Sequence, residues 1–262
     1  MCLLTFLPAG VLPDPAALLN GAAINDDGHG YAIVVDDHIL VRHGMLAEDM
    51  VETFDTIRRE HPDGPALFHS RFATHGEPTL DNCHPYLVGG DARTVLAHNG
   101  VLPAIVQPAT GDPRSDTRIA AEDFLPTFGS LTLRRTRLQV ERWMTRHNKM
   151  VILTVDRRFK QRAYILNETS GIWDGDIWYS NDGYLPPPPR QRWRRPARRP
   201  WPLWDRLEPT SNQCGLCGAV IDLTRAQCPY CCWCLDCGEM PEDCSCWPPA
   251  VPGRRIGRQP TR

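Results

Sequence analysis

The second residue of the chain, Cys2, has the chemistry of a nucleophile. It becomes the first residue if Met1 is removed, which a small second side chain permits. Its thiol and its own α-amino group then belong to one residue, and an amine with a pKa of about 8 can act as a base toward a thiol with a pKa of about 8.5. A terminal nucleophile therefore carries its own base. The alternative is that Cys2 is a small buried residue that starts a strand.

Four further residues offer groups that suit an amino-acid substrate. Arg71 follows a predicted strand and has a planar pair of donors that fits a carboxylate. Asn99 and Gly100 end another predicted strand, where a side-chain amide and a backbone N–H can form an oxyanion hole. Asp116 follows a predicted helix N-cap and can accept a hydrogen bond from an ammonium group. Together these groups suit a zwitterionic amino acid that bears a scissile carbonyl.

Each of these residues also has an ordinary structural explanation. An arginine after a strand often forms a surface ion pair, and Asn-Gly is typical of a type I′ hairpin turn. Ser115-Asp116-Thr117 is a common helix-capping sequence. The chemical explanation is favoured by the order in which the motifs follow one another.

That order resembles the glutaminase domain of class II glutamine amidotransferases, and the match is closest to the stretch seen in glucosamine-6-phosphate synthase. After Cys2 come His-Ser-Arg-Phe-Ala-Thr-His-Gly-Glu-Pro at 69–78, His-Pro at 84–85, His-Asn-Gly at 98–100 and Ser-Asp-Thr at 115–117. The turn at 25–32 is similar to that of stand-alone members that hydrolyse γ-glutamyl compounds, and 168–184 resembles the closing strands of such domains. The resemblance covers about residues 2–185.

The resemblance implies an α+β fold, a four-layer αββα sandwich of the N-terminal-nucleophile (Ntn) hydrolase type. It implies that Cys2 is the nucleophile, that its freed amine is the general base, and that Asn99 and Gly100 form the oxyanion hole. Glutamine is the implied substrate, and the residues expected to hold it are Arg71 at the α-carboxylate, Asp116 at the α-ammonium, and Thr74 and His75 beside it. Attack on the side-chain amide would release ammonia and leave a γ-glutamyl thioester for water to cleave, with no cofactor for catalysis.

The chain departs from the family pattern in two places. Leu3 stands where a glycine usually follows the nucleophile, which puts the local backbone geometry in doubt. The chain after residue 185 is too short for a full acceptor domain, so ammonia transfer would need a separate protein partner. For His29 and His84 we expect a supporting or packing role, and for Cys83 no role beyond packing.

Short apolar runs and helical periodicity predict the elements that position these residues. Strands are expected at 31–35, 66–69, 95–98 and 150–155, because these runs are rich in β-branched or apolar residues and end in turn residues. Helices are expected from Asp14-Pro15 to Leu19, over Ala47–Glu60, from about Leu133 to His147, and from Ser115 onward. The sequence Asn-Glu-Thr-Ser-Gly at 167–171 is interpreted as a hairpin turn.

The composition changes near residue 185. Residues 1–185 hold 17 Lys/Arg and 24 Asp/Glu, whereas residues 186–262 hold 12 Arg and 7 Asp/Glu. Eight of the 25 prolines lie within residues 186–209, and nine of the 11 cysteines lie beyond residue 185. These shifts predict a glutaminase domain at 1–185, a Pro/Arg-rich linker at 186–212, a Cys-rich module at 213–247 and a disordered basic tail at 248–262.

The Cys-rich module has the spacing of a zinc ribbon. Two CxxC pairs separated by ten residues suit a tetrahedral four-thiolate site, and a second site is arithmetically available. The expected zinc ligands are Cys214, Cys217, Cys228 and Cys231 for the first ion, and Cys234, Cys237, Cys244 and Cys246 for a second. Cys232 has no assigned role. The alternative is a disulfide cluster, which requires an oxidising compartment.

The linker contains seven arginines between Arg190 and Arg206, with three tryptophans among them. Such a segment could contact nucleic acid, or it could be a solvated linker whose charges prevent collapse. No apolar run approaches the ~20 residues that cross a bilayer, and the first residues do not read as a signal peptide, so we expect a cytoplasmic protein without membrane contact.

These observations favour a glutamine amidohydrolase that supplies ammonia to a separate acceptor enzyme docked through the zinc module. One alternative is a stand-alone hydrolase of γ-glutamyl amides or peptides that uses the same site. An alternative of another class is a non-catalytic adaptor that binds protein or nucleic acid through the zinc ribbon.

Overall fold

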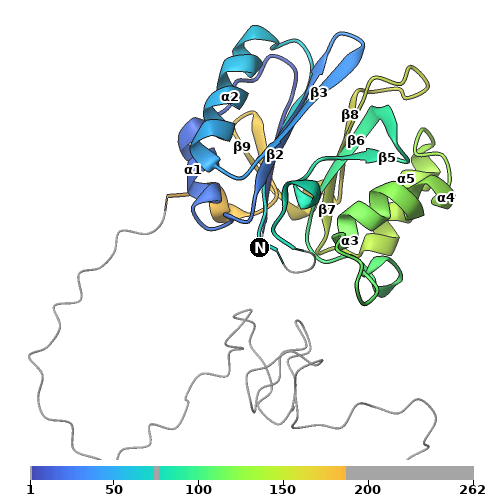
Figure 1. Ribbon diagram of the computed structural model, residues 1–262. Helices are drawn as coiled ribbons and strands as arrows, with labels where there is room; N and C mark the ends of the chain where they lie inside the picture. Colours follow the sequence, from blue (N-terminus) through green and yellow to red (C-terminus); the bar gives the residue numbers. More distant parts are fainter. Residues whose placement is uncertain (1, 74–76, 187–262) are drawn as a thin grey trace, which may run out of the picture. The chain divides into compact units, whose positions relative to one another are not determined.

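The computed structural model describes residues 2–73 and 77–186, and these residues form two antiparallel sheets between two layers of helices (Figure 1). The first sheet has the strand order β3-β2-β4-β1-β10-β9, and the second has the order β5-β6-β7-β8. The expected layers, αββα, are therefore confirmed for this part of the chain.

The strands of the first sheet are β1 (Leu3–Leu7), β2 (His29–Val35), β3 (His38–Gly44), β4 (Ala66–Ser70), β9 (Ile172–Asp174) and β10 (Ile177–Tyr179). Those of the second are β5 (Tyr86–Val88), β6 (Asp91–Asn99), β7 (Lys149–Thr154) and β8 (Ala163–Leu166). Strands β1, β2 and β4 are buried along their whole length because each of their two faces is covered.

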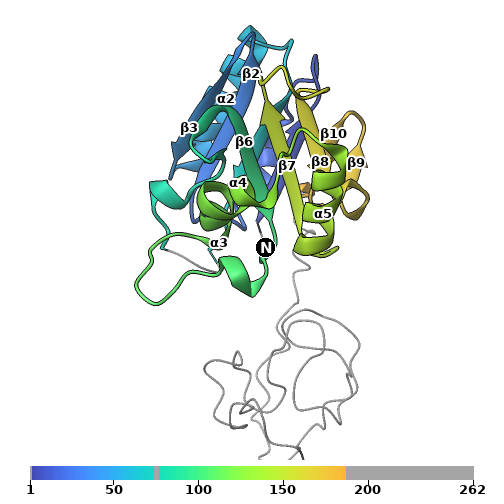
Figure 2. The ribbon, with the colours of Figure 1, turned by 90° about the vertical axis from the view of Figure 1, so that its right-hand side faces the viewer.

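Helices α1 and α2 cover the first sheet, and the helices between β6 and β7 cover the second (Figure 2). On the first sheet lie α1 (Pro15–Ala22) and α2 (Ala47–Glu60); on the second lie α3 (Asp116–Ile119), a π-helical turn η3 (Ala120–Phe124), α4 (Leu125–Phe128) and α5 (Arg134–Met144). Short 3₁₀ turns complete the described part: η1 (Leu80–Asn82), η2 (Ala104–Val106), η4 (Glu168–Ser170) and η5 (Asp182–Tyr184).

Alternate residues of each strand pack on opposite faces, and this produces three apolar layers. In β4, Phe68 packs toward α1 and α2, whereas Leu67 packs toward the second sheet. In β6, Val95 packs between the sheets and Leu96 packs under α3 to α5. Each residue of these strands thus has a defined face, which fixes where the polar residues at the strand ends lie.

The predicted strands and helices are present, with small differences at their ends. Asp14 caps α1 by accepting hydrogen bonds from the N–H groups of Ala16 and Ala17, as Asp-Pro predicts, although the helix runs on to Ala22. The helix expected from Leu133 to His147 ends at Met144 because Thr145 adopts a positive φ of 68°.

The interpretation of residues 167–171 as a hairpin turn is wrong. These residues join β8 of the second sheet to β9 of the first, so they cross from one layer to the other. Asn167 has left-handed backbone angles, as a turn residue would, and a 3₁₀ turn follows it. Gly171 is needed there because a Cβ would overlap the ring of Trp178, which is buried between the sheets. Local turn chemistry did not reveal which sheet each flanking strand joins.

None of the helices in the described residues is long and apolar enough to cross a membrane.

Candidate active site

The thiol of Cys2 lies against the backbone that follows strand β4. Strands β1 and β4 pair with Leu3 opposite Ser70, which brings Cys2 beside the next residues of the β4 chain. The Cys2 sulfur accepts a hydrogen bond from the Phe72 N–H at 3.3 Å and lies 3.5 Å from the Phe72 carbonyl oxygen. The carbonyl of Cys2 accepts a hydrogen bond of 2.8 Å from the Asn181 side chain. Both the side chain and the backbone of Cys2 are therefore held.

Burial raises the pKa of the Cys2 thiol, and the Phe72 backbone hydrogen bond and the nearby charge of Arg71 act in the opposite direction. The raising effect is the larger one. Because the thiolate is the nucleophilic form of cysteine, this thiol needs a base to remove its proton before it can attack a carbonyl.

Leu3, the residue that departs from the family pattern, is accommodated by a glycine in helix α1. Its side chain is 2% exposed and packs with Ala17, Tyr179 and Tyr184. A Cβ at Gly21 would overlap the end of the Leu3 side chain. The absence of a side chain at position 21 thus leaves the room that Leu3 fills, and β1 keeps its regular pairing beside Cys2.

The carboxamide of Asn99 is tied to the strand that follows Cys2. Asn99 ends β6 in the second sheet, and its Nδ2 donates a hydrogen bond of 2.7 Å to the Ser180 hydroxyl. The same hydroxyl accepts the Leu4 N–H at 2.9 Å. Ser180 therefore joins the two sheets at the end where Cys2 lies. An amide nitrogen has two N–H groups, and the second has no partner among the described residues.

Gly100 does not belong to a hairpin, so the type I′ turn offered as its alternative explanation is wrong. The chain leaves β6 through η2 and the helices, and it returns to pair with β6 only at β7. Gly100 has a φ of 140°, a region that favours glycine, and a Cβ there would overlap the side-chain oxygen of Asn148. Two independent constraints therefore require glycine beside Asn99.

Arg71 is 3% exposed, which is incompatible with a surface ion pair. Its backbone N–H donates to Gly28 and its carbonyl accepts from Asp27, at 2.8 and 3.0 Å. Its guanidinium donates a hydrogen bond of 3.0 Å to the Glu77 carbonyl. The turn at Asp27-Gly28 thus positions the arginine, and the Asp27 carboxylate also accepts the Ala73 N–H at 2.7 Å.

Asp116 is the first helical residue after the N-cap Ser115, and it is 5% exposed. One carboxylate oxygen accepts the Leu102 N–H at 2.8 Å, and the other accepts the Thr117 N–H at 2.7 Å. The first of these bonds ties α3 to the loop that leaves Gly100. Each carboxylate oxygen has more than one lone-pair direction, so Asp116 can still accept a hydrogen bond from a cation.

Short chains of bonds join five of the predicted residues. Cys2 lies at Phe72, which follows Arg71, and the strand after Cys2 is joined through Ser180 to Asn99. The loop after Gly100 is joined to Asp116. Thr74 and His75 lie outside the described residues, as do all eight predicted zinc ligands from Cys214 to Cys246. Within the described residues, no group of His, Cys, Asp or Glu is arranged to hold a metal ion.

Sequence reasoning missed several residues that support this site. Ser180 and Asn181 lie in the segment 168–184 that contributes to the resemblance, but nothing in that segment's sequence predicts contacts with Asn99 and Cys2. Asn148 was not singled out at all. The contact between Phe72 and Cys2 uses backbone groups, for which side-chain identity gives no signal.

Buried histidines pack beside the ends of the central strands. The rings of His69 and His84 stack with centroids 4.0 Å apart, and the Nε2 of His69 lies 3.0 Å from the His98 carbonyl oxygen. His29 contacts the Ser70 hydroxyl at 3.1 Å. Burial lowers the pKa of His69 to about 3 and also lowers that of His84, so both rings are neutral at physiological pH. These contacts are those of supporting residues.

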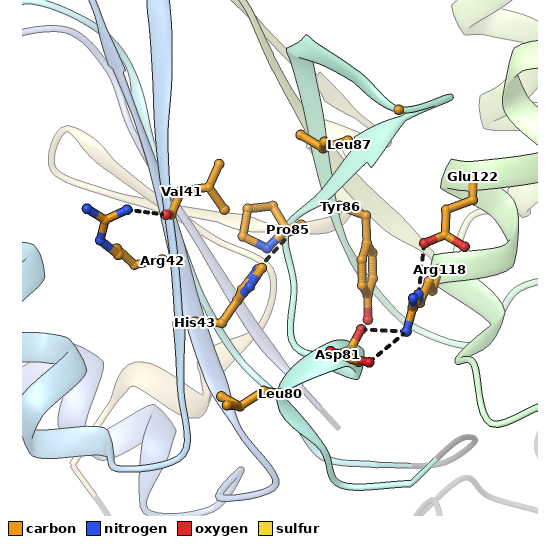
Figure 3. Close-up of a pocket in the computed structure, with 11 residues that line it drawn as sticks. Val41, Arg42, His43, Leu80, Asp81, Pro85, Tyr86, Leu87, Arg118 and Glu122 are labelled. Carbon is orange, nitrogen blue, oxygen red and sulfur yellow. Dashed lines mark hydrogen bonds and ion pairs between the residues drawn. The ribbon is translucent and has the colours of Figure 1, made fainter.

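An open cavity of about 620 Å³ lies between the edge strands β3 and β5 (Figure 3). Its lining includes Pro85 and Tyr86, and His43 reaches across to the Pro85 carbonyl at 3.0 Å. Arg118 on the helical side pairs with Glu122 at 2.8 Å. Of the residues predicted to act on a substrate, those that the structure describes do not line this cavity.

The chain is similar in sequence to glutamine-dependent aminotransferases, although no protein-family model matches it. Over 104 residues it is 32% identical to the isomerizing glutamine–fructose-6-phosphate aminotransferase of Leifsonia xyli subsp. xyli, spanning 36% of this chain and 17% of that protein. Over 77 residues it is 38% identical to the enzyme of the same name from Aliivibrio fischeri, spanning 29% of this chain and 12% of that protein. The chain thus spans less than a fifth of the length of these relatives.

The chain also has a more distant likeness to solved structures. A glutamine phosphoribosylpyrophosphate amidotransferase from B. subtilis aligns with a TM-score of 0.44 and 17% identity over 68% of this chain and 41% of that one. A glutamine aminotransferase class-II domain protein from Silicibacter pomeroyi aligns with a TM-score of 0.33 and 12% identity over 68% of this chain and 87% of that one. The homologues of this chain are class II glutamine amidotransferases, and these homologues are enzymes.

Proposed function

We propose that residues 2–185 form a glutaminase domain of the Ntn-hydrolase type, which hydrolyses the side-chain amide of glutamine and releases ammonia. One observation carries this proposal: a thiol held at the Phe72 backbone is joined, through Leu4 and Ser180, to the carboxamide of Asn99. The glutamine-dependent enzymes named above support the choice of substrate.

In the proposed reaction, removal of Met1 frees the α-amine of Cys2, and this amine takes the proton of the thiol. A base is needed because burial raises the pKa of the thiol. The sulfur then attacks the side-chain carbonyl carbon of glutamine, and the carbonyl π electrons move to oxygen. The tetrahedral intermediate therefore carries an oxyanion bound to the carbon that also bears sulfur and nitrogen.

The free N–H of the Asn99 carboxamide and the backbone N–H of Gly100 would donate hydrogen bonds to this oxyanion. Such donors act on charge that develops only in the transition state, and each contributes about 2.7–4 kcal/mol. When the intermediate collapses, the C–N bond breaks and ammonia leaves with the proton held by the Cys2 amine. Water then attacks the carbonyl carbon of the γ-glutamyl thioester and gives a proton to the Cys2 amine. The C–S bond breaks, glutamate leaves, and the amine returns the proton to the sulfur to regenerate the thiol.

Substrate recognition completes the proposal. Arg71 would bind the α-carboxylate of glutamine and Asp116 its α-ammonium, with Thr74 and His75 beside the substrate. Arg71 and Asp116 are almost fully buried, so an ion pair with the substrate would be weakly screened by water. The substrate would have to be zwitterionic at its α-carbon, which excludes simple amides.

The proposed fate of the ammonia is delivery to a separate acceptor enzyme. The chain matches only a small share of its relatives' length, so their acceptor chemistry is not carried over with the matched residues. A stand-alone hydrolase of γ-glutamyl amides or peptides would use the same five residues. The two functions differ in whether an added acceptor protein stimulates turnover and in whether γ-glutamyl peptides compete with glutamine.

The test is mass spectrometry combined with an ammonia-release assay. We expect the purified protein to lack Met1, to release ammonia from glutamine, and to be labelled at Cys2 by an electrophilic glutamine analogue. Cys2→Ala should abolish activity. Cys83→Ala is the matched control, because burial raises the pKa of that thiol to about 11 and the reaction does not use it. Retention of Met1 together with no ammonia release would overturn the mechanism and favour the adaptor function.

For the Cys-rich module, which lies outside the described residues, we propose one or two structural zinc ions in a reducing, cytoplasmic compartment. Thiolate ligands and a closed tetrahedral site would make the metal part of the folding energy of the module. A chelator should release zinc and expose residues 213–247 to protease without loss of glutaminase activity. A metal-free protein purified under reducing conditions would contradict this proposal.

A further inference from the structure

His98 precedes Asn99 and lies, 1% exposed, between two polar side chains that the proposed reaction does not use. Its Nε2 lies 2.8 Å from the Asn148 side-chain oxygen, and its Nδ1 lies 3.0 Å from the Thr117 hydroxyl. Asn148 lies under Gly100, and Thr117 follows Asp116. One imidazole therefore contacts a neighbour of the proposed oxyanion hole and a neighbour of the proposed ammonium site.

The hydrogen-bond partners assign the tautomer of this imidazole. The Nδ2 of Asn148 donates to the Met144 carbonyl and the Thr145 hydroxyl, so its Oδ1 is the atom that faces His98. His98 must therefore carry its proton on Nε2. Burial lowers the pKa of His98, and this is the largest effect. The charge of Asp116 raises the pKa and the charge of Lys149 lowers it, so the ring is neutral. A neutral ring protonated on Nε2 has an acceptor at Nδ1.

The Thr117 hydroxyl has one proton and two acceptors within reach. It lies 3.0 Å from the His98 Nδ1 and 3.2 Å from a carboxylate oxygen of Asp116. When the proton goes to His98, this oxygen of Asp116 retains only the hydrogen bond from the Thr117 backbone. The oxygen can then accept a hydrogen bond from an ammonium group. Without an acceptor at His98, the hydroxyl would donate to Asp116 and compete with the substrate.

The other side of His98 fixes the position of Gly100. A Cβ at Gly100 would overlap the Asn148 oxygen, so the Gly100 backbone lies directly against that side chain. The Asn148 oxygen is itself held by the hydrogen bond from His98. A shift of Asn148 would move Gly100 and the N–H that is proposed to stabilise the oxyanion.

We propose that His98 is a positioning residue with two separable roles in the glutaminase site. Through Asn148 it sets the direction of the Gly100 N–H, and through Thr117 it keeps a carboxylate oxygen of Asp116 open for the substrate ammonium. This inference rests on the proposed function, and His98 itself contacts neither the glutamine nor the reacting atoms.

Two substitutions separate the roles because glutamine can replace the Nε2 donor and asparagine can replace the Nδ1 acceptor. His98→Gln keeps the bond to Asn148 and loses the acceptor for Thr117. We expect KM for glutamine to rise by about 10-fold or more, the effect of about 1.4 kcal/mol of lost binding, with kcat little changed.

His98→Asn keeps the Thr117 partner and loses the Asn148 bond. We expect kcat to fall by about 10-fold or more, with KM little changed.

The decisive variant is His98→Gln combined with Thr117→Val, which removes the competing hydroxyl while keeping its shape. We expect the double variant to return KM toward the wild-type value. If the two substitutions instead damaged the fold, their effects would add up in the double variant. Titration of active sites with the electrophilic glutamine analogue normalises kcat to the folded fraction. Calorimetric binding of glutamine to the same substitutions in a Cys2→Ala background gives a readout that is independent of turnover.

The outcomes are distinguishable. Equal changes of kcat and KM in both single variants, or no recovery in the double variant, would overturn the role of His98 while leaving an active wild type. A wild type that neither releases ammonia nor binds glutamine would overturn the proposed function and this inference with it.

Discussion

At the scale of single residues, the described site depends on positions where only one residue type fits. Gly100 is such a position because its φ of 140° and its contact with Asn148 each oppose any larger residue. Gly111 also has a positive φ, of 89°, but a Cβ there would meet nothing within 4 Å. The two glycines share the backbone constraint and differ in the steric one.

We predict that Gly100→Ala lowers kcat for glutamine by about 100-fold or more, because displacement of the backbone N–H removes the proposed oxyanion donor. Gly111→Ala is the matched control. It should cost about 1 kcal/mol of stability, as alanine at a positive φ does, and leave kcat unchanged. Steady-state kinetics and urea unfolding measure the two effects. Similar kinetics for both variants would argue against a role of the Gly100 N–H.

The sequence could indicate residues whose chemistry lies in their own side chain. Cys2, Arg71 and Asp116 were singled out in this way, and the structure shows that Arg71 and Asp116 are buried and hydrogen-bonded. Residues that act through a neighbour were not predictable. Asn148 and Ser180 are ordinary polar residues until the two sheets bring each against a partner far away in the chain.

At the scale of elements, β1 and α1 pack through an unusual pair of residues. Leu3 fills the space that a side chain at position 21 would occupy. A glycine in a helix costs about 0.5–1 kcal/mol relative to alanine, so this space is kept at the expense of helix stability. The sequence showed Leu3 as a departure from the family pattern but gave no sign that Gly21 compensates for it.

We predict that the effect of Gly21→Ala on stability changes sign with the residue at position 3. In the wild type, overpacking against Leu3 should cost about 1–3 kcal/mol, more than the helix gains. In a Leu3→Ala background the overlapping end of the side chain is gone and the Cβ of residue 3 lies 3.3 Å away, so Gly21→Ala should stabilise by up to about 1 kcal/mol. Urea unfolding of the four proteins gives the coupling. Additive effects would mean that Leu3 moves aside freely.

Elements with local signals were predictable, whereas their partners were not. Asp14-Pro15 marked the start of α1, and the spacing of Met50, Phe54 and Ile57 marked the buried face of α2. The segment at 167–171 has the residues of a turn, but the assignment of β8 and β9 to different sheets depends on contacts that no local pattern records.

At the scale of the whole molecule, the fold buries histidines that the unfolded chain would expose. The folded-state pKa of His69 is about 3, against an ordinary value of 6.5, because burial disfavours the charged ring. Between these two values the unfolded chain binds a proton on this residue and the folded protein does not. The contribution of His69 to stability is therefore fully present above about pH 6.5 and is lost as the pH falls below that value.

We predict that the free energy of unfolding decreases by about 1.4 kcal/mol per pH unit for each such histidine below pH 6. His84, whose pKa burial also lowers, adds to this slope. His69→Gln keeps a donor for the His98 carbonyl and removes one titrating group, so its slope should be smaller. His38→Gln, at an exposed position, is the control. Urea unfolding between pH 7.5 and 5 measures the slopes; an unchanged slope in His69→Gln would contradict the prediction.

Cys2, near the start of the chain, is held by Asn181, 179 positions later. Strand β1 therefore pairs with β10 only after nearly all of residues 2–185 have been synthesised, and the Cys2 carbonyl gains its hydrogen bond from Asn181 at the same stage. A nascent or truncated chain that lacks the last strand has the nucleophile but not the surroundings that orient it. The order of synthesis thus delays the assembly of the proposed active site until the domain that encloses it is complete.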